Sequence, residues 1–150
     1  MGFTFSFPMV QKAVNVAILE TWTKDFDCPD AVGKDAAHLL QTAIDEHKGL
    51  KVKLVATLND TTGTLVQGLY YDPTCAIGLI LGTGSNACYI EKIENVKYWT
   101  ERDEWLKEGY EWVIIDMECG GFGDNGIIDF AKTKYDLSLD KESLFPHSYT

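Results

Sequence analysis

Basic residues are scarce in this sequence of 150 residues, where 13 lysine and arginine side chains stand against 23 aspartate and glutamate side chains. The resulting formal net charge of -10 at pH 7 repels the phosphate backbone of DNA or RNA, so we expect no nucleic-acid partner. This charge does not exclude a nucleotide ligand, because a few backbone N–H groups can bind phosphate locally.

Long apolar runs and closely spaced cysteines are also missing. No stretch approaches the roughly 18 apolar residues that a membrane span requires, and residues 1–8 lack the charged and apolar regions of a secretory signal. The four cysteines, Cys28, Cys75, Cys88 and Cys119, form no C-x-x-C pair, which favours reduced thiols over a zinc site. We therefore expect a soluble, cytoplasmic protein without a structural metal.

The composition that remains is ordinary for a globular protein. Hydrophobic residues make up 45% of the chain and charged residues 24%, which is enough for one domain-sized core. Phe3, Phe5 and Phe7 alternate with hydroxyl residues, which predicts a strand that ends at Pro8. The β-branched and aromatic segment 16–23 predicts a second strand.

A helix and a strand follow in the first half of the chain. Apolar residues spaced by three and four predict a helix over residues 33–48, with Gly49 at its C-terminal end. Residues 50–58 predict a strand, followed by a polar turn over residues 59–64 and a short helix to about Gly68. This order of strand, polar turn and helix is typical of ligand sites in α/β sheets.

The second half is rich in glycine and in predicted strands. A turn cluster at residues 71–73 indicates a boundary. Residues 76–93 predict a β-hairpin with a glycine turn over residues 82–86, and residues 112–117 predict a further strand. The remaining segments are predicted to be a surface excursion with a short helix over 95–111, a glycine-rich loop over 118–126 and a helix over 127–135.

Several residues are candidates for chemistry. Asp60 at a predicted strand end is placed as a general base would be, although the spacing alone favours an ordinary helix N-cap. Residues 82–85 offer glycine N–H groups and hydroxyls that suit a phosphate, and a hairpin turn without a ligand fits equally well. Glu118 lies among glycines that favour the presentation of a carboxylate, whereas a lysine such as Lys24 at a strand end is usually just solvated.

A dinucleotide-dependent oxidoreductase is a further interpretation. Residues 82–87 satisfy the loose dinucleotide-binding fingerprint, which requires a helix directly after it. The strand predicted to follow these residues argues against that interpretation.

Five segments, in order along the chain, resemble the hexokinase family over nearly all of the sequence. Residues 2–8 (GFTFSFP) look like the family's sugar-binding strand, residues 58–64 (LNDTTGT) like its catalytic strand and turn, and residues 81–89 (LGTGSNACY) like its second phosphate segment. Residues 21–24 (TWTK) and 117–123 (MECGGFG) complete the set. The resemblance implies an α/β fold, namely a partial actin-like, ribonuclease-H-like hexokinase fold with mixed sheets and flanking helices.

The same resemblance implies ATP-dependent phosphorylation of a hexose, such as glucose, at its 6-hydroxyl in the first step of glycolysis. Mg²⁺ would arrive with the nucleotide. Asp60 would be the catalytic base. The ATP phosphates would contact Gly82, Thr83, Gly84 and Ser85. The sugar hydroxyls would bind to Ser6, Thr23, Lys24, Asn59, Asn86 and Glu118.

By this resemblance, residues 1–72 would be the C-terminal part of the family's small domain and residues 73–150 the N-terminal part of its large domain. The family's Asp-Leu-Gly-Gly-Thr phosphate loop and adenosine pocket have no counterpart here, so the expected partners are a hexose, ATP and the missing remainder of the fold. Cys119 stands where the family usually has Trp, and the excursion over residues 95–111 is longer than usual. These departures leave open the activity of the chain alone, with a non-catalytic sugar-binding or regulatory relative as the alternative.

Overall fold

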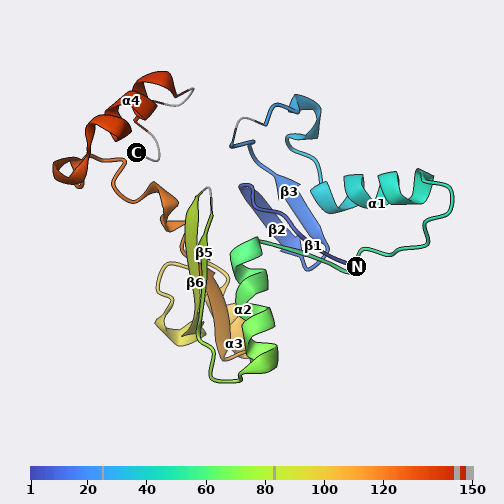
Figure 1. Ribbon diagram of the computed structural model, residues 1–150. Helices are drawn as coiled ribbons and strands as arrows, with labels where there is room; N and C mark the ends of the chain where they lie inside the picture. The colour runs from blue at the N-terminus through green and yellow to red at the C-terminus, as the bar shows by residue number, and fades with distance from the viewer. Residues whose placement is uncertain (25, 83, 144–145, 148–150) are drawn as a thin grey trace. The chain divides into compact units, whose positions relative to one another are not determined.

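The computed structural model describes residues 1–24, 26–82, 84–143 and 146–147 (Figure 1). The chain divides into two compact units, Met1–Gly63 and Thr64–Thr150. The first unit holds two two-stranded sheets, and the second holds a three-stranded sheet. Among the helices of the described residues, none has the length and apolar character needed to cross a membrane.

Two short parallel strands form the first sheet of the first unit. The strand β1 (Gly2–Thr4) pairs with β4 (Ala56–Leu58). The predicted strand over residues 50–58 is therefore a strand only at its end. The reason is that the Gln41 side chain holds the preceding segment, since its Oε1 accepts the Leu54 N–H at 2.6 Å and its Nε2 donates to the Val52 carbonyl at 3.1 Å.

The second sheet of this unit is an antiparallel hairpin of β2 (Met9–Ala13) and β3 (Val16–Leu19). The sequence pattern missed β2 and extended β3 to Thr23. β3 ends at Leu19, whose backbone pairs with the segment that leads into the next helix, since its N–H donates to the Lys34 carbonyl at 3.0 Å and its carbonyl accepts the Gly33 N–H at 2.8 Å.

The helix predicted over residues 33–48 is confirmed as α1 (Ala36–Glu46). Asp35 caps it, since its Oδ1 accepts the Ala37 N–H at 3.0 Å. Ala37 and Ile44 are buried on its inner side and contribute to the core of the first unit. Gly49 follows the helix with a φ of 99°, a conformation that glycine adopts without strain.

The helix α2 (Asp60–Tyr71) begins directly after β4. The polar turn predicted over residues 59–64 is thus wrong, because most of these residues form the first turn of α2. Asn59 starts the helix, since its side-chain Oδ1 accepts the Thr61 N–H at 2.7 Å. The helix also runs beyond its predicted end at Gly68.

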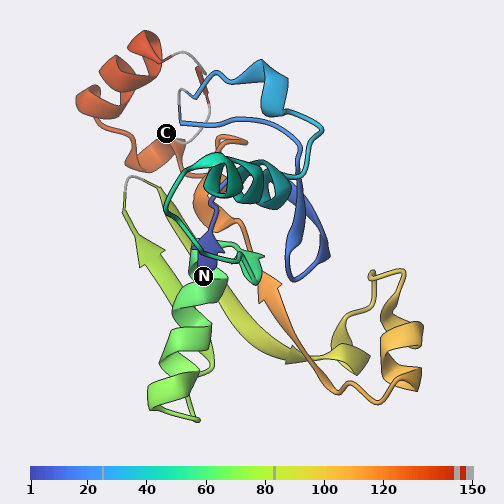
Figure 2. The same ribbon diagram turned by 90° about the vertical axis from the view of Figure 1, so that its right-hand side faces the viewer.

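The second unit contains the predicted hairpin. The strands β5 (Ile77–Leu81), β6 (Ser85–Lys92) and β7 (Trp112–Asp116) form one antiparallel sheet in the order β5-β6-β7. The excursion between β6 and β7 carries the short helix α3 (Arg102–Lys107), as the sequence predicts. Figure 2 shows this excursion at the end of the sheet opposite to the β5–β6 turn. The buried Cys88 lies in the central strand, and burial raises the pKa of its thiol.

The last helix, α4 (Lys134–Glu142), starts later than the helix predicted over residues 127–135, which is wrong in position. The capping box of Thr133 with Asp136 fixes the start of α4. Short 3-10 helices occupy Pro29–Ala31, Ile93–Asn95, Cys119–Gly121 and Asp129–Ala131.

Candidate functional site

Predicted site residues of the first unit follow the carboxyl ends of β1 and β4. Because these strands are parallel, Ser6 after β1 and Asn59 with Asp60 after β4 emerge at the same edge of the sheet. The Phe5 N–H donates to the Leu58 carbonyl at 2.9 Å and keeps the two segments side by side beyond the strand ends. The edge at which α/β sheets bind ligands thus carries three of the predicted residues.

Asp60 is the first residue of α2, and its carboxylate is half-buried. Its Oδ1 accepts the Thr61 N–H at 2.9 Å and lies 3.4 Å from the Thr61 hydroxyl, which donates to it. The Asn59 Oδ1 atom accepts the same Thr61 N–H at 2.7 Å, so both neighbours hydrogen-bond the first turn of α2.

The first turn of α2 approaches β1 closely at Gly63. A Cβ atom built on Gly63 would lie 3.1 Å from Cγ2 of Thr4 and 3.6 Å from Cδ1 of Leu58. The first of these distances is tighter than an ordinary van der Waals contact, so glycine suits this position. The close packing fixes the start of the helix, and with it Asp60, against the strands.

Lys24 and Ser6 are brought together in the first unit. Lys24 Nζ donates to the Ser6 carbonyl at 3.0 Å and lies 5.2 Å from the centroid of the Phe7 ring. The backbone of Lys24 has a φ of 58°, in the left-handed region. The Lys24 ammonium group is therefore held by these contacts, whereas a lysine at a strand end is usually solvated. Thr23 precedes it in the chain and is half-buried.

An aromatic cluster supports this lysine. The Phe7 and Trp22 rings meet edge to face with centroids 4.8 Å apart, and Trp22 stacks on Phe26 at 5.8 Å. The Trp22 indole N–H donates to the Cys28 carbonyl at 2.7 Å, which fixes the ring. The segment that carries Lys24 is therefore held by ring packing and not only by its own backbone.

A polar cluster in the second unit joins Asn86 of β6 to Asp116 and Glu118. Asn86 Nδ2 donates to Asp116 Oδ1 at 2.7 Å and to Glu118 Oε1 at 3.1 Å. The Asn86 Oδ1 atom accepts the Ala87 N–H at 2.8 Å and the Cys119 N–H at 3.4 Å. Two of the predicted sugar-binding residues, Asn86 and Glu118, are thus in direct contact.

Sequence reasoning missed Asp116. A signal was available, because Asp116 is the one charged side chain in the otherwise apolar run 113–117. A charge at the end of an apolar, half-buried strand favours a hydrogen-bonding partner, and here that partner is the Asn86 amide.

The β5–β6 turn carries the predicted phosphate contacts Gly82, Gly84 and Ser85, while Thr83 lies outside the described residues. The Gly82 N–H donates to the Gly84 carbonyl at 2.9 Å, so this amide is engaged within the turn. No atom outside the turn lies within 4 Å of a Cβ built on Gly84. Because the strand β6 starts at Ser85, the helix that a dinucleotide fingerprint requires is absent from these described residues, and that interpretation fails.

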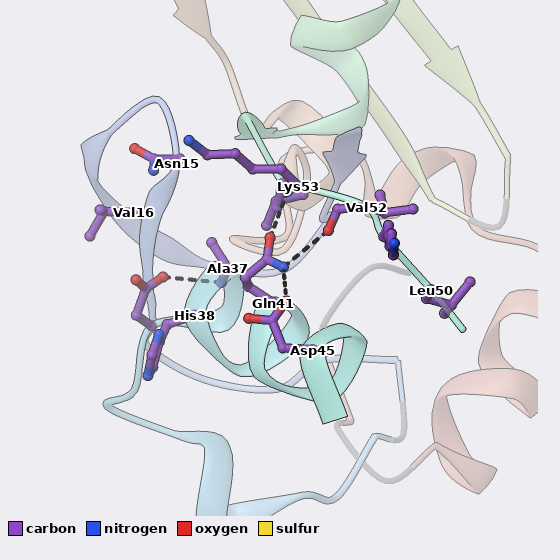
Figure 3. A pocket seen from close by; sticks show the side chains of 12 residues that line it. Asn15, Val16, Ala37, His38, Gln41, Asp45, Leu50, Val52 and Lys53 are labelled. Atoms are coloured by element: carbon purple, nitrogen blue, oxygen red, sulfur yellow. Dashed lines mark hydrogen bonds between the residues drawn. The ribbon is translucent and has the colours of Figure 1, made fainter. Parts of the chain in front are cut away.

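A pocket of about 730 Å³ lies elsewhere in the first unit, between α1 and residues 50–54 (Figure 3). Figure 3 shows Gln41 at its centre, with hydrogen bonds to the Val52 carbonyl and to Asp45. None of the predicted site residues lines this pocket.

Comparison with known proteins places the chain in one family. Two family models, both described as hexokinase, match the chain, one over residues 1–70 and the other over residues 76–150. Hexokinase-1 of Pongo abelii is 46% identical over 144 residues and human hexokinase-2 is 43% identical over 147 residues, with 96% and 97% of this chain covered. The chain spans 15% of the length of each of these relatives.

Solved structures agree. A hexokinase from Schistosoma mansoni in complex with glucose is 44% identical with a TM-score of 0.77, covering 99% of this chain and 32% of that one. A second hexokinase structure is 37% identical with a TM-score of 0.63, and the match covers 99% of this chain and 30% of the chain in that structure. The expected partial α/β hexokinase fold is therefore confirmed. On sequence and fold alike, the chain belongs to the hexokinase family.

Proposed function

We propose that the protein containing this chain transfers a phosphoryl group from ATP to the 6-hydroxyl of a hexose such as glucose. The observation that carries the proposal is the position of the Asp60 carboxylate at the start of α2. Asn59 caps the helix, and the Asp60 carboxylate is oriented by Thr61 at the carboxyl edge of the sheet. The names of the matched relatives support phosphorylation of a hexose, and one matched hexokinase is described as complexed with glucose.

Asp60 accepts the proton of the hydroxyl that is phosphorylated. A carboxylate held in one orientation by hydrogen bonds is suited to this step, and a positioned base contributes roughly 10² to 10⁴ in rate. The other hydroxyls of the sugar bind to side chains that offer both donors and acceptors. We assign this role to Ser6, Thr23, Lys24, Asn59, Asn86 and Glu118.

ATP with Mg²⁺, when bound, supplies the phosphoryl group and neutralises its charge. The turn between β5 and β6 fits a phosphate at Gly84, which has open space beside its Cα atom, and at the exposed Ser85. The Gly82 N–H is engaged by Gly84, so Gly82 serves the turn's shape and leaves room for the ligand. The role of Thr83 as a phosphate contact stays a prediction.

We also propose that residues 1–72 and 73–150 are parts of the small and the large domain of the family. The two family matches end and begin on either side of residues 71–75, which supports a division near this point. The remainder of a hexokinase fold is then the expected partner of this segment, and the cytoplasm stays its predicted location.

The experiment replaces Asp60 in the native polypeptide that carries these residues. In Asp60→Asn we expect glucose-dependent ADP release to fall by about 10² to 10⁴, because the amide cannot accept the proton. Calorimetry should show glucose affinity close to that of the wild type, because the cap at Asn59 is untouched. The matched control is Asp72→Asn, whose carboxylate binds Thr74 in an exposed turn and which should keep full turnover.

Two results would contradict the proposal. A wild-type protein that binds glucose but releases no ADP would be a non-catalytic sugar-binding relative. An Asp60→Asn variant that loses glucose binding together with turnover would show that Asp60 maintains the structure of the site rather than acting as the base.

A further inference from the structure

The side-chain amide of Asn86 has every hydrogen-bonding atom engaged. Its two Nδ2 hydrogens point to Asp116 and Glu118, and its Oδ1 accepts two backbone N–H groups. The backbone N–H groups can only donate, so they fix which end of the amide is oxygen. The NH₂ end is consequently directed at the two carboxylates.

The two carboxylates differ in how firmly the fold holds them. Asp116 is half-buried at the end of β7, in register with Cys88 of β6, and its bond to Asn86 is the shorter one at 2.7 Å. Glu118 is exposed beyond the strand, with a left-handed backbone φ of 47° and a bond of 3.1 Å. A short hydrogen bond to an ionised acceptor is the stronger kind. The fold thus holds Asp116 in place, and Asp116 restrains Glu118 indirectly, through the Asn86 amide.

We infer that Asp116 is a positioning residue for sugar binding, acting through Asn86 on Glu118. This inference rests on the proposed function, since it needs Glu118 to bind a sugar hydroxyl. Asp116 anchors the Asn86 NH₂ group, and the second hydrogen of that group then holds the Glu118 carboxylate at one place. A pre-oriented carboxylate binds a sugar hydroxyl without first losing side-chain freedom.

The cluster also explains why two carboxylates can lie close together. Asp116 and Glu118 carry like charges, and the shared NH₂ group supplies one donor to each of them. Without Asp116, the NH₂ group of Asn86 keeps only the longer bond to the exposed Glu118. The orientation of the Glu118 carboxylate then becomes less defined, although the backbone of β6 and β7 is unchanged.

The test compares three variants of the native polypeptide. Asp116→Ala removes the acceptor, and Asp116→Asn keeps an acceptor oxygen of the same shape without the charge. Asp103→Asn is the matched control, because this exposed carboxylate pairs only with the neighbouring Arg102 among the described contacts and removes the same charge. We expect the KM for glucose to rise about tenfold in Asp116→Ala, with kcat much less affected, because one charge-assisted hydrogen bond is lost.

Asp116→Asn should restore part of the glucose affinity, with a KM between those of the wild type and Asp116→Ala. A purely structural role predicts instead that kcat and the fraction of folded protein fall together and that Asp116→Asn behaves as the wild type. A KM in Asp116→Ala within about twofold of the Asp103→Asn control would overturn the inference.

A second readout needs no turnover. In ¹⁵N-correlated NMR spectra of the chain, the two Nδ2 protons of Asn86 should have distinct, displaced shifts that collapse toward those of a solvated amide in Asp116→Ala. Unchanged shifts would overturn the inference even where the protein phosphorylates glucose. If the wild type proves inactive while the shifts change as expected, the proposed function fails and the anchoring of Asn86 by Asp116 stands.

Discussion

Thr57 shows how much a single hydroxyl costs when it is buried without a partner. The residue is 1% exposed in the middle of β4, and its Oγ1 has no hydrogen-bond partner among the described residues. Its backbone is satisfied, since its N–H donates to the Val14 carbonyl and its own carbonyl accepts from Gln11. A buried hydroxyl without a partner destabilises the folded state.

Thr57→Val should therefore raise the free energy of unfolding by about 1 to 2 kcal/mol, because the methyl group removes the desolvation cost at the same volume. Urea denaturation measures this change. The same replacement at Thr61, which is equally buried but donates to Asp60, should lower the free energy of unfolding. An equal loss of stability in both variants would refute this explanation.

Single residues also show which parts of the candidate site can be predicted from the sequence. A carboxylate at the strand-to-helix junction could be singled out, because both a base and a cap prefer that place. That the Asn59 and Asp60 side chains both accept the Thr61 N–H depends on side-chain torsions that no spacing encodes. Asp116 was missed for a similar reason, since its importance comes from a contact across two strands with Asn86, 30 positions earlier in the chain.

The start of α4 is the element whose boundary depends most clearly on side chains. Asp136 Oδ2 accepts the Thr133 hydroxyl at 2.7 Å and the Thr133 N–H at 2.6 Å, while the Thr133 hydroxyl accepts the Tyr135 N–H at 3.2 Å. The hydroxyl and then the backbone N–H of Thr133 hold the pKa of Asp136 below its ordinary value.

Because this pKa is lowered in the folded state, the stabilisation of α4 by Asp136 is complete above the ordinary value of 3.8 and is lost as the pH falls through the lower folded-state pKa. We expect the NMR signals of residues 134–142 to lose helical character in that acidic range. In Thr133→Val the pKa of Asp136, followed through its side-chain carbonyl carbon, should move up toward the ordinary value. An identical titration in both proteins would contradict the capping account.

Elements with strong local signals were predicted well, and those set by distant contacts were not. The apolar spacing of α1 and the glycine turn between β5 and β6 are local, and both elements appear as expected. The segment before β4 has the composition of a strand but is held by the side chain of Gln41. The position of α4 follows its capping box, whose Thr133-x-x-Asp136 spacing is present in the sequence and was overlooked.

At the scale of the whole molecule, an exposed apolar strip along β5 predicts self-association in solution. Ile77, Leu79 and Leu81 alternate along β5 and share one face, with 66%, 54% and 79% of their surfaces exposed. The strand β5 is also an edge of its sheet in the described chain. Exposed apolar faces at sheet edges favour association with other chains.

We expect the 150-residue chain to self-associate through this strip despite its net charge of -10. Leu79→Lys should lower the average mass measured by analytical ultracentrifugation at the same concentration. Tyr98→Lys is the control, because Tyr98 is 98% exposed but lies outside the sheet, and it should leave the mass unchanged. Equal masses for wild type and Leu79→Lys would show that β5 is not the associating face.

The family assignment rests on motifs that can be recognised in the sequence. The proposed reaction requires that the phosphoryl group of ATP is transferred to the 6-hydroxyl of the sugar. The most direct measurement is ³¹P NMR of the native polypeptide incubated with glucose, ATP and Mg²⁺. The account predicts a growing sugar 6-phosphate ester signal in step with ADP, and almost none with Asp60→Asn. Free inorganic phosphate as the only product, or an equally strong ester signal from Asp60→Asn, would contradict it.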